Sequence, residues 1–320
     1  MARLARYGRR MKAALSPALP ALAAASAPPA SAERRRRLAG IGLMCLAVMC
    51  FASLDATAKW LGREMNPLLV TWFRYAAGVA VVSVVLNPWM TPGLARTRRP
   101  WLQALRSFLL LACTALNFLA LEHLQLAQTI SILFATPLLV ALLAGPLLGE
   151  RMDSGRLGAI AVGFLGVLVV TRPGFGAMHP AALYSVAGTV AYAAYALCTR
   201  VLAAHDSTAT TLFYSGLAGL LLLTPVLPAL WVAPPSPGSW ALLLLLGALG
   251  SVGHWLLILA HARAPAGVLS PFIYTQLLWM VALGYLVFGD WPDHWTLAGG
   301  LIVAASGLYL IAQERGRRAG

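Results

Sequence analysis

Charged side chains inside apolar segments are the first sign of chemistry in this 320-residue chain. Asp55 and Lys59 lie four residues apart, so a helix over residues 38–61 would carry both on one face. Arg74 lies in the next apolar segment. At about 1.5 Å of rise per residue, Asp55 and Arg74 both sit roughly 9 Å below the same interface. Charges inside a span face the protein interior, so these residues predict a polar anchor for an anionic or zwitterionic substrate, with Asp55 and Lys59 as candidates for proton coupling.

The same side chains also have a purely structural interpretation. Asp55 and Arg74 could neutralise each other as an ion pair, and Lys59 could extend along its span to the interface, as lysines near span ends often do. Lys59 is therefore the member of the group with the weakest case for a role in transport. The sequence leaves both interpretations open.

The third and fourth apolar segments flank a cluster of uncharged polar side chains. They are Asn117, Gln125, Gln128, Thr129 and Ser131. Such residues either line a cavity or hydrogen-bond one helix to another within the membrane. We place Asn117 and Gln128 in the cavity, Asn117 with the better case because an amide deep in a span needs a partner.

Aromatic side chains with polar tips occur in the second half of the chain. Tyr192 and Tyr195 share a helical face, and Tyr274, Gln276 and Trp279 follow in a later segment. Such groups line sites for planar or amphipathic solutes, although they also pack between helices. We predict that these five residues line the cavity.

Two prolines and one histidine complete the candidates within the spans. Pro137 and Pro271 each interrupt a long apolar segment. Both therefore predict a helix kink at which the protein can bend. His254 could titrate near neutral pH, but a hydrogen-bonded structural histidine is the favoured interpretation.

The elements that position these residues are membrane spans. The chain is 60% hydrophobic and 11% charged, with a mean hydropathy of +0.76, more apolar surface than a soluble domain can bury. Four cysteines lie in apolar stretches without metal-ligand spacing, so we expect no metal and no cofactor. We predict an all-α protein with ten transmembrane helices, near residues 38–61, 68–88, 101–121, 125–147, 156–173, 180–202, 208–231, 239–260, 266–288 and 295–313.

The basic residues predict the orientation of these spans. Nine of them precede residue 38, and with the N-terminus inside, twenty lie in inner segments against two in outer loops. The net charge of +14 therefore reflects the orientation of the spans in a cell inner membrane, with both termini cytoplasmic. Because the basic residues do not form a binding surface, we expect no nucleic-acid partner. We interpret residues 1–37 as a disordered basic cytoplasmic tail, a presequence being the alternative, and residues 314–320 as a second tail.

The chain repeats itself at an offset of 139 to 141 residues. Ala135-Thr136-Pro137 corresponds to Tyr274-Thr275-Gln276, Gly149-Glu150 to Gly289-Asp290, and Lys59 to Arg200. Because five is an odd number, the second copy of a five-span repeat starts on the opposite side of the membrane and is inverted relative to the first. We therefore predict one five-helix repeat over residues 38–174 and a second over residues 180–313, the architecture of a secondary transporter.

The tract Pro137…Gly149-Glu150…Gly158…Gly166, with its second copy Gln276…Gly289-Asp290…Gly299…Gly307, resembles the EamA domain of the drug/metabolite transporter superfamily. The resemblance covers roughly residues 38–313. It implies ten helices in two inverted halves and transport of a small metabolite. The segment Phe51–Lys59 with Trp72–Tyr75 is similar to bacterial members assigned to cofactor-like or nucleoside-like metabolites.

The functional prediction is a secondary active transporter that moves a small polar or zwitterionic metabolite by alternating access, either proton-coupled or facilitative. The sequence contains no Walker motif and no HExxH or GxSxG motif, so neither direct ATP use nor an enzyme is expected. The alternative is a membrane chaperone or scaffold without transport activity. Membrane lipid is an expected partner, and a homodimer is one oligomeric state that the sequence allows.

Overall fold

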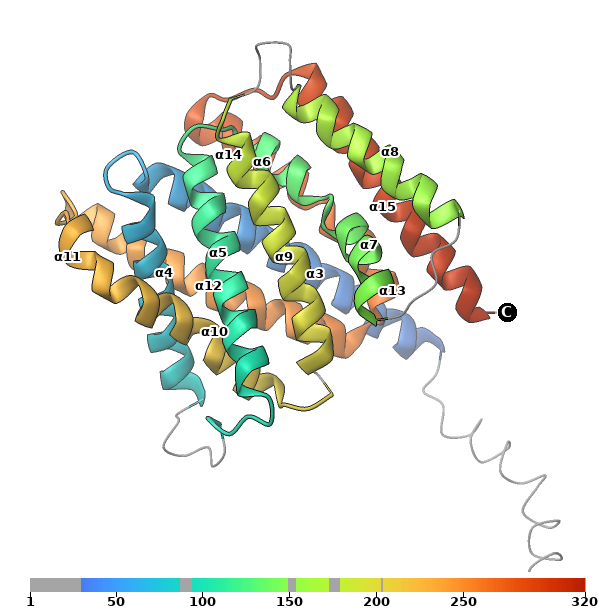
Figure 1. Ribbon diagram of the computed structural model, residues 1–320, viewed down its shortest axis with the longest axis horizontal. Coiled ribbons are helices and arrows are strands. Elements are labelled where there is room, and N and C mark those ends of the chain that lie inside the picture. Colours follow the sequence, from blue (N-terminus) through green and yellow to red (C-terminus); the bar gives the residue numbers. More distant parts are fainter. Residues whose placement is uncertain (1–29, 87–93, 149–153, 173–178, 203, 320) are drawn as a thin grey trace, which may run out of the picture.

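The computed structural model describes residues 30–86, 94–148, 154–172, 179–202 and 204–319, and within them every regular element is a helix (Figure 1). The elements are α3 (Ala30–Leu61), α4 (Pro67–Leu86), α5 (Pro100–Leu121), α6 (Leu126–Leu133), α7 (Thr136–Leu148), α8 (Ser154–Thr171), α9 (Ala182–Leu202), α10 (Thr208–Leu223), η1 (Thr224–Val226), α11 (Leu227–Leu230), α12 (Pro237–Arg263), α13 (Ala266–Ile273), α14 (Gln276–Phe288) and α15 (His294–Ala319).

The length and hydropathy of these helices make the chain a multi-pass membrane protein. In the described ranges, nine helical segments are long and apolar enough to cross a bilayer. The fifth predicted span corresponds to α8, which is a shorter apolar helix. The predicted all-α class is confirmed, and the predicted spans coincide with the helices to within a few residues, except at the start of α3.

Helix α3 begins at Ala30, so the end of the segment that we expected to be a disordered tail is helical. Glu33 lies in the first turn, where a carboxylate is favourable to the helix dipole, and it pairs with Arg37 one turn later. These contacts extend the helix beyond its apolar part. Residues 1–29 lie outside the described residues. At the other terminus α15 continues through Ala319, into the predicted tail over residues 314–320.

The packing of the helices follows the inverted repeat. Helix α3 packs along α12, and α9 packs along α5. Because α9 and α12 take the places of α3 and α5 in the second repeat, exchanging the two repeats exchanges these two contacts. Helix α8 packs on its own counterpart α15, and α4 packs on its counterpart α10. The two halves are therefore related by an approximate two-fold operation.

Both repeats contain one broken span, and the two breaks match. Helices α6 and α13 have 8 residues each, and α7 and α14 have 13 residues each. The breaks fall at residues 134–135 and 274–275, before Pro137 and after Pro271. Pro137 has no backbone N–H, so the Leu133 carbonyl lacks its usual helical donor. This carbonyl accepts a hydrogen bond from Thr136 Oγ1 at 2.7 Å instead.

The two breaks meet at the centre of the molecule. The rings of Phe134 and Tyr274 lie edge to face with their centroids 4.8 Å apart. Thr275 Oγ1 donates to the Phe272 carbonyl at 2.6 Å, as Thr136 does in the first repeat. Threonine hydroxyls of the protein thus hydrogen-bond one backbone carbonyl at each break, as the absence of water from a membrane interior requires.

Candidate functional site

A central cavity of about 890 Å³ lies between the two repeats. Side chains of α3, α4, α5 and α6 form one part of its wall, and side chains of α9, α12 and α14 form the other. Among the predicted site residues, the cavity brings together Asp55, Arg74, Asn117, Tyr192 and Gln276. The breaks in the fourth and ninth spans therefore lie beside a polar site.

Asp55 is the acid of the cavity, and it is 9% exposed. The amide Nδ2 of Asn117 donates to its Oδ1 at 3.0 Å. The amide that the sequence predicted to need a partner therefore has one, on the neighbouring span. A neutral donor stabilises the carboxylate and holds its position but leaves its charge without a counterion in contact.

Arg74 is the base of the cavity. Its Nη1 donates to Thr114 Oγ1 at 2.8 Å, and Thr114 also shares a 3.0 Å hydrogen bond with the Tyr75 hydroxyl. The guanidinium carbon lies 5.1 Å from the centre of the Tyr75 ring. Its Nε is buried and has no hydrogen-bond partner. The guanidinium is therefore anchored at one nitrogen while another donor stays unused.

The two charges of the cavity do not touch each other. Among the ion pairs of the described residues, none joins Asp55 to Arg74. Each charge is hydrogen-bonded to a neutral side chain of α5 instead. This geometry disagrees with the structural interpretation in which Asp55 and Arg74 form a closed ion pair.

The second repeat contributes an aromatic and hydroxyl-bearing wall. Tyr192 lines the cavity and stacks on Tyr195 with ring centroids 5.5 Å apart. His254 also lines it, with Nδ1 bonded to the Gly250 carbonyl at 2.9 Å and its ring edge to face with Phe51 at 5.0 Å. Because a carbonyl only accepts, Nδ1 carries the hydrogen and Nε2 of the neutral ring can accept. His254 is thus hydrogen-bonded, in agreement with the favoured interpretation, and it also lines the cavity.

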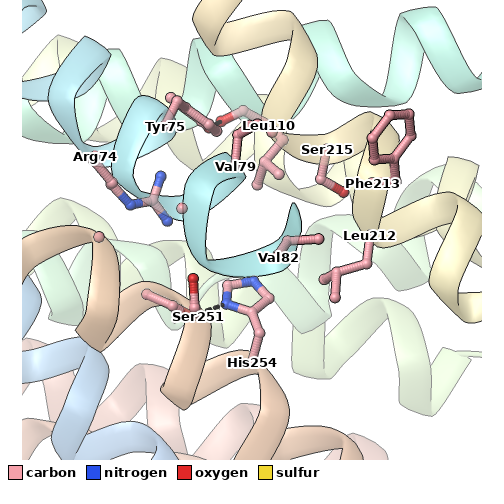
Figure 2. A pocket seen from close by; sticks show the side chains of 14 residues that line it. Arg74, Tyr75, Val79, Val82, Leu110, Leu212, Phe213, Ser215, Ser251 and His254 are labelled. Carbon is pink, nitrogen blue, oxygen red and sulfur yellow. Dashed lines mark hydrogen bonds between the residues drawn. The ribbon is translucent and has the colours of Figure 1, made fainter. Parts of the chain in front are cut away.

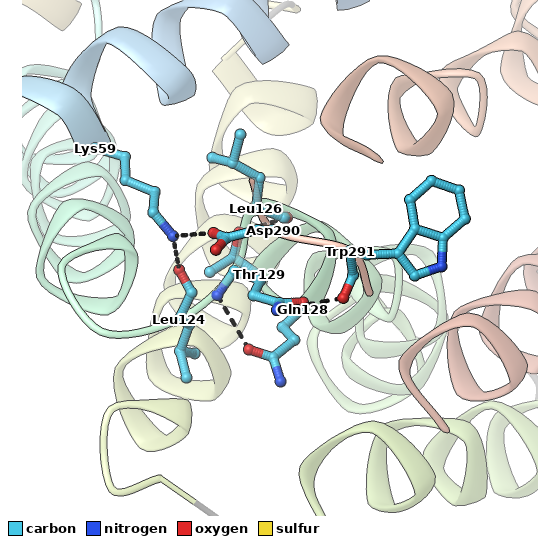
Figure 3. A network of polar contacts seen from close by, with 8 residues as sticks. Lys59, Leu124, Leu126, Gln128, Thr129, Asp290 and Trp291 are labelled. Atoms are coloured by element: carbon cyan, nitrogen blue, oxygen red, sulfur yellow. Dashed lines mark hydrogen bonds and ion pairs between the residues drawn. The ribbon is translucent and has the colours of Figure 1, made fainter. Parts of the chain in front are cut away.

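Lys59 lies in a different network from Asp55 and Arg74 (Figure 3). Its Nζ donates to Asp290 Oδ2 at 2.9 Å and to the Leu124 carbonyl at 2.8 Å. It also lies 5.1 Å from the centre of the Phe288 ring. Lys59 thus joins the end of α3 to the α5–α6 connection and to the α14–α15 connection. We call the side of the bundle where α3 ends the Leu61 face, and the opposite side, where α9 ends, the Leu202 face.

Gln128 serves α6 rather than the cavity. Its Oε1 accepts from the backbone N–H of Gln125 at 3.0 Å in a capping box at the start of that helix (Figure 3). Gln125 Nε2 reaches the Trp291 carbonyl at 3.5 Å. Trp279 is 39% exposed and does not line the cavity. Our placement of these two residues in the central cavity is therefore corrected, because the rotation of their helices turns them elsewhere.

Tyr274 and Pro137 line a second space at the two helix breaks. This space shares Leu133, Tyr192 and Gln276 with the central cavity. The Tyr274 hydroxyl is buried without a partner, and a Cβ at Gly307 would lie 1.9 Å from it. Three shared side chains therefore separate the two spaces.

Arg106 is a buried charge, and it is one of the twenty basic residues that the sequence places in inner segments. It is 4% exposed. It donates to Tyr195 Oη at 2.8 Å, Thr199 Oγ1 at 2.8 Å, Ser215 Oγ at 2.7 Å and the Thr211 carbonyl at 3.1 Å. Tyr195 therefore serves this cluster instead of the cavity, which corrects its predicted position.

A pattern in the sequence could have revealed both Arg106 and Thr114. Arg106, Leu110, Thr114 and Asn117 follow one another at steps of four, four and three residues, so they share one face of α5. Ser185 and Thr189, also missed, lie four residues apart on α9 and line the cavity. Single hydroxyl residues in apolar spans are common, so only the combination with Arg106 and Asn117 would have been informative.

Two aspartates in the connections hold loops in place. Asp206 accepts from Thr97 Oγ1, from the Arg98 N–H at 2.9 Å and from Gln103 Nε2 at 2.9 Å. Partial burial raises the pKa of Asp206, but these donors lower it further, so the net pKa lies below its ordinary value. Asp293 pairs with Arg172 at 2.7 Å. Its pKa is likewise lowered, because the Thr296 and Arg172 donors outweigh burial.

Metal ligands are not gathered in the part of the chain that the structure describes, where no group of three or more His, Cys, Asp or Glu side chains could hold an ion.

The two halves of the chain match one known family twice. The EamA-like transporter family matches residues 38–172 and residues 179–313. A solved crystal structure that is 18% identical superposes with a TM-score of 0.58, covering 88% of this chain and 98% of that one. At that identity the likeness concerns the fold alone.

Curated relatives of similar length are transporters. The S-adenosylmethionine uptake transporter of Rickettsia conorii is 29% identical, over 87% of this chain and 94% of its own. The riboflavin transporter of Vibrio cholerae is 28% identical, with the same coverage. The pseudopaline exporter CntI of Pseudomonas aeruginosa is 24% identical, over 87% of this chain and 97% of its own.

Proposed function

The chain belongs to the EamA-like transporter family and is a membrane transporter of small metabolites, and from that premise we propose that it carries a zwitterionic metabolite held between Asp55 and Arg74. The observation that carries the proposal is the separation of these charges within one cavity. A substrate ammonium group would bind the Asp55 carboxylate, and a substrate carboxylate would bind the Arg74 guanidinium. Buried charges without counterions are costly, so a zwitterion that matches both is favoured over a neutral solute.

The wall of the second repeat suits a planar group on the same substrate. Tyr192 offers an aromatic face, and His254 Nε2 and the Ser185 hydroxyl are hydrogen-bonding groups beside it. S-adenosylmethionine, which the first relative takes up, combines an α-amino acid group with a purine ring. It is therefore the first substrate to test, and riboflavin, which has a planar ring without an amino acid group, is the informative comparison.

We propose alternating access between the inverted repeats as the transport mechanism. The Lys59–Asp290 pair joins the two repeats at the Leu61 face, which makes it a candidate for the closure of that face, and the Leu124 carbonyl of the first repeat holds Lys59 in place. The matched breaks in the fourth and ninth spans supply places where the halves can bend. On the distribution of basic residues, the Leu61 face is external and both termini are cytoplasmic, in a cell inner membrane.

Asp55 is the proposed site of proton coupling. It is a nearly buried carboxylate whose hydrogen-bond partner is a neutral amide, so proton binding would change the charge of the cavity by one unit without breaking an ion pair. A facilitative mechanism without coupling is the alternative. The two differ in whether an imposed proton gradient drives accumulation of the substrate.

The test is flux into proteoliposomes that contain the purified chain. Labelled S-adenosylmethionine and riboflavin are offered with and without an inward proton gradient, and binding is followed in parallel by thermal stabilisation. We expect saturable uptake of the zwitterion, faster with the gradient, and weaker or no uptake of riboflavin. Uptake of riboflavin alone would overturn the zwitterion proposal. If no member of a wider metabolite panel is transported or raises the thermal stability of the protein, a chaperone or scaffold is favoured instead.

A further inference from the structure

A third space, open on one side, lies between α4, α10 and α12, and Leu110 of α5 also lines it (Figure 2). Its wall is apolar along most of its length, where Val79, Val82, Leu212 and Phe213 are partly exposed. We call this space the α4–α10 crevice. All of these helices are long and apolar enough to cross a membrane, so the crevice lies within the membrane-spanning part of the molecule.

One end of the crevice is polar. Figure 2 shows the Arg74 guanidinium and the Ser251 hydroxyl at the same end, away from Val82, Leu212 and Phe213. Arg74 Nε is buried without a partner, and only Nη1 is engaged, by Thr114. The Ser251 hydroxyl makes no hydrogen bond with any described residue. The Arg74 guanidinium and the Ser251 hydroxyl, with the ring of His254, therefore form the polar end of a space that is otherwise mostly apolar.

Gly78 makes room beside these donors. A Cβ added at Gly78 would meet nothing within 4 Å except Ser251 Oγ at 3.8 Å, so the α4 backbone at Gly78 borders open space. The opposite wall is different, because a Cβ at Gly247 would lie 2.3 Å from the Ala77 Cβ. Close packing on one side and open space on the other make Gly78 the position where a larger side chain would fill the crevice.

We propose that the α4–α10 crevice is a binding site for an amphipathic monocarboxylate with a medium-length alkyl chain. The carboxylate accepts from the Arg74 guanidinium and Ser251 Oγ, and the chain lies against Val79, Val82, Leu212 and Phe213. Charge-assisted hydrogen bonds set the position of the head. Arg74 and Val82 are eight residues apart on α4, which gives the tail roughly 12 Å of apolar wall.

The site shares Arg74, Leu110 and His254 with the central cavity. A bound carboxylate therefore occupies the cation that the proposed zwitterionic substrate needs, and the two ligands compete. This consequence rests on the proposed function. Binding of the monocarboxylate itself does not, since it needs no transport.

The probe is labelled decanoate, with the protein in lipid nanodiscs and empty nanodiscs subtracted as background. We expect saturable binding of decanoate, about tenfold or more weaker binding of octanoate because two buried methylenes are lost, and no saturable binding of decanol, which lacks the anion. Equal binding of decanol would show partition into an apolar groove and would overturn the proposal. Failure of decanoate to saturate would do the same.

A matched pair of glycine variants places the site. Gly78→Val fills the crevice, whereas Gly158→Val adds the same side chain on α8, where a Cβ would also meet nothing within 4 Å. We expect Gly78→Val to weaken decanoate binding at least tenfold and Gly158→Val to leave it unchanged. Equal affinities would place decanoate elsewhere and overturn the proposal. If Gly78→Val does not fold, Val82→Trp fills the same space, with the same expected loss.

Transport assays separate this proposal from the proposed function. Gly78 does not line the central cavity, so Gly78→Val should transport normally while losing inhibition by decanoate. Decanoate binding without zwitterion flux would overturn the proposed function and leave the crevice proposal standing. If the zwitterion is transported but decanoate neither binds nor inhibits, the crevice proposal is overturned and the proposed function stands.

Discussion

Two pairs of opposite charge begin on the same helix, α3, and they are arranged in opposite ways. Lys59 and Asp290 are in contact at 2.9 Å near the Leu61 face. Asp55 and Arg74, one turn deeper, each hydrogen-bond a neutral side chain and do not touch. A pair in contact has already satisfied its charges and serves to hold elements together. A pair held apart keeps its charges available for a ligand.

The difference follows from which side chains surround each pair. The Lys59 side chain is long enough to leave α3 and reach a connection of the other repeat. Asp55 and Arg74 are instead held by Asn117 and Thr114, which lie three residues apart on α5. Helix α5 thus keeps the two charges on separate supports. The proposed functions of the two pairs can be tested by breaking each one.

The largest effect is expected from removing a charge of the separated pair. Asp55→Asn should lower uptake of the zwitterionic substrate about 100-fold or more, because a charged partner of the ligand is lost in a site with little water. Arg74→Gln should do the same. Proteoliposome flux measures the loss, and expression and melting temperature should stay near those of the unmodified protein.

Glu122→Gln is the matched control for Asp55→Asn. It makes the same change from carboxylate to amide in an exposed loop of one repeat, where Glu122 lies beside His123. It should transport normally. If Asp55→Asn and Arg74→Gln both transport as the unmodified protein does, the separated charges are structural and the comparison fails.

A smaller effect is expected from the pair in contact. Lys59→Gln or Asp290→Asn should lower the transport rate several-fold and the melting temperature by a few degrees, since a partly exposed ion pair contributes about 1 kcal/mol or less. The double exchange Lys59→Asp with Asp290→Lys should recover part of the loss. A double exchange that is worse than either single variant would argue against a direct interaction between these two residues.

The aromatic wall should affect affinity more than rate. Tyr192→Ala removes the ring that lines the cavity and should raise KM about tenfold, by the loss of roughly 1.5 kcal/mol of aromatic contact. Tyr195→Phe removes only the hydroxyl that accepts from Arg106, so it should lower stability and leave KM unchanged. Equal effects of the two variants on KM would show that the Tyr195 hydroxyl also contributes to substrate binding, against its assignment to the Arg106 cluster.

The smallest effect concerns pH and a loop carboxylate. Because the folded-state pKa of Asp206 lies below its ordinary value, its stabilising contribution is fully present above the unfolded-state pKa of about 3.9. It is lost as the pH falls through the lower folded-state value. The melting temperature should therefore drop more between pH 5 and pH 3 in the unmodified protein than in Asp206→Asn. Identical pH profiles would show that the hydrogen bonds to Asp206 contribute nothing to stability.

The sequence by itself determined the spans, the duplication and the depth of the main charges. Span positions follow from local hydropathy, and depth follows from the constant rise of a helix, so neither requires knowledge of neighbouring helices. These two local properties were therefore enough to place Asp55, Arg74 and Asn117 together. The helix at residues 30–37 was missed because its side chains are polar and exposed, and hydropathy does not report such a segment.

Only the tertiary structure decided which charges touch. The partner of Lys59 is 231 residues away, and the partners of Arg106 lie on α9 and α10. Such choices depend on the rotation of each helix about its own axis, and that rotation is set by packing across the whole bundle. The same rotation turned Gln128 into a helix cap, moved Tyr195 to Arg106, and left Asp55 and Arg74 apart in one cavity.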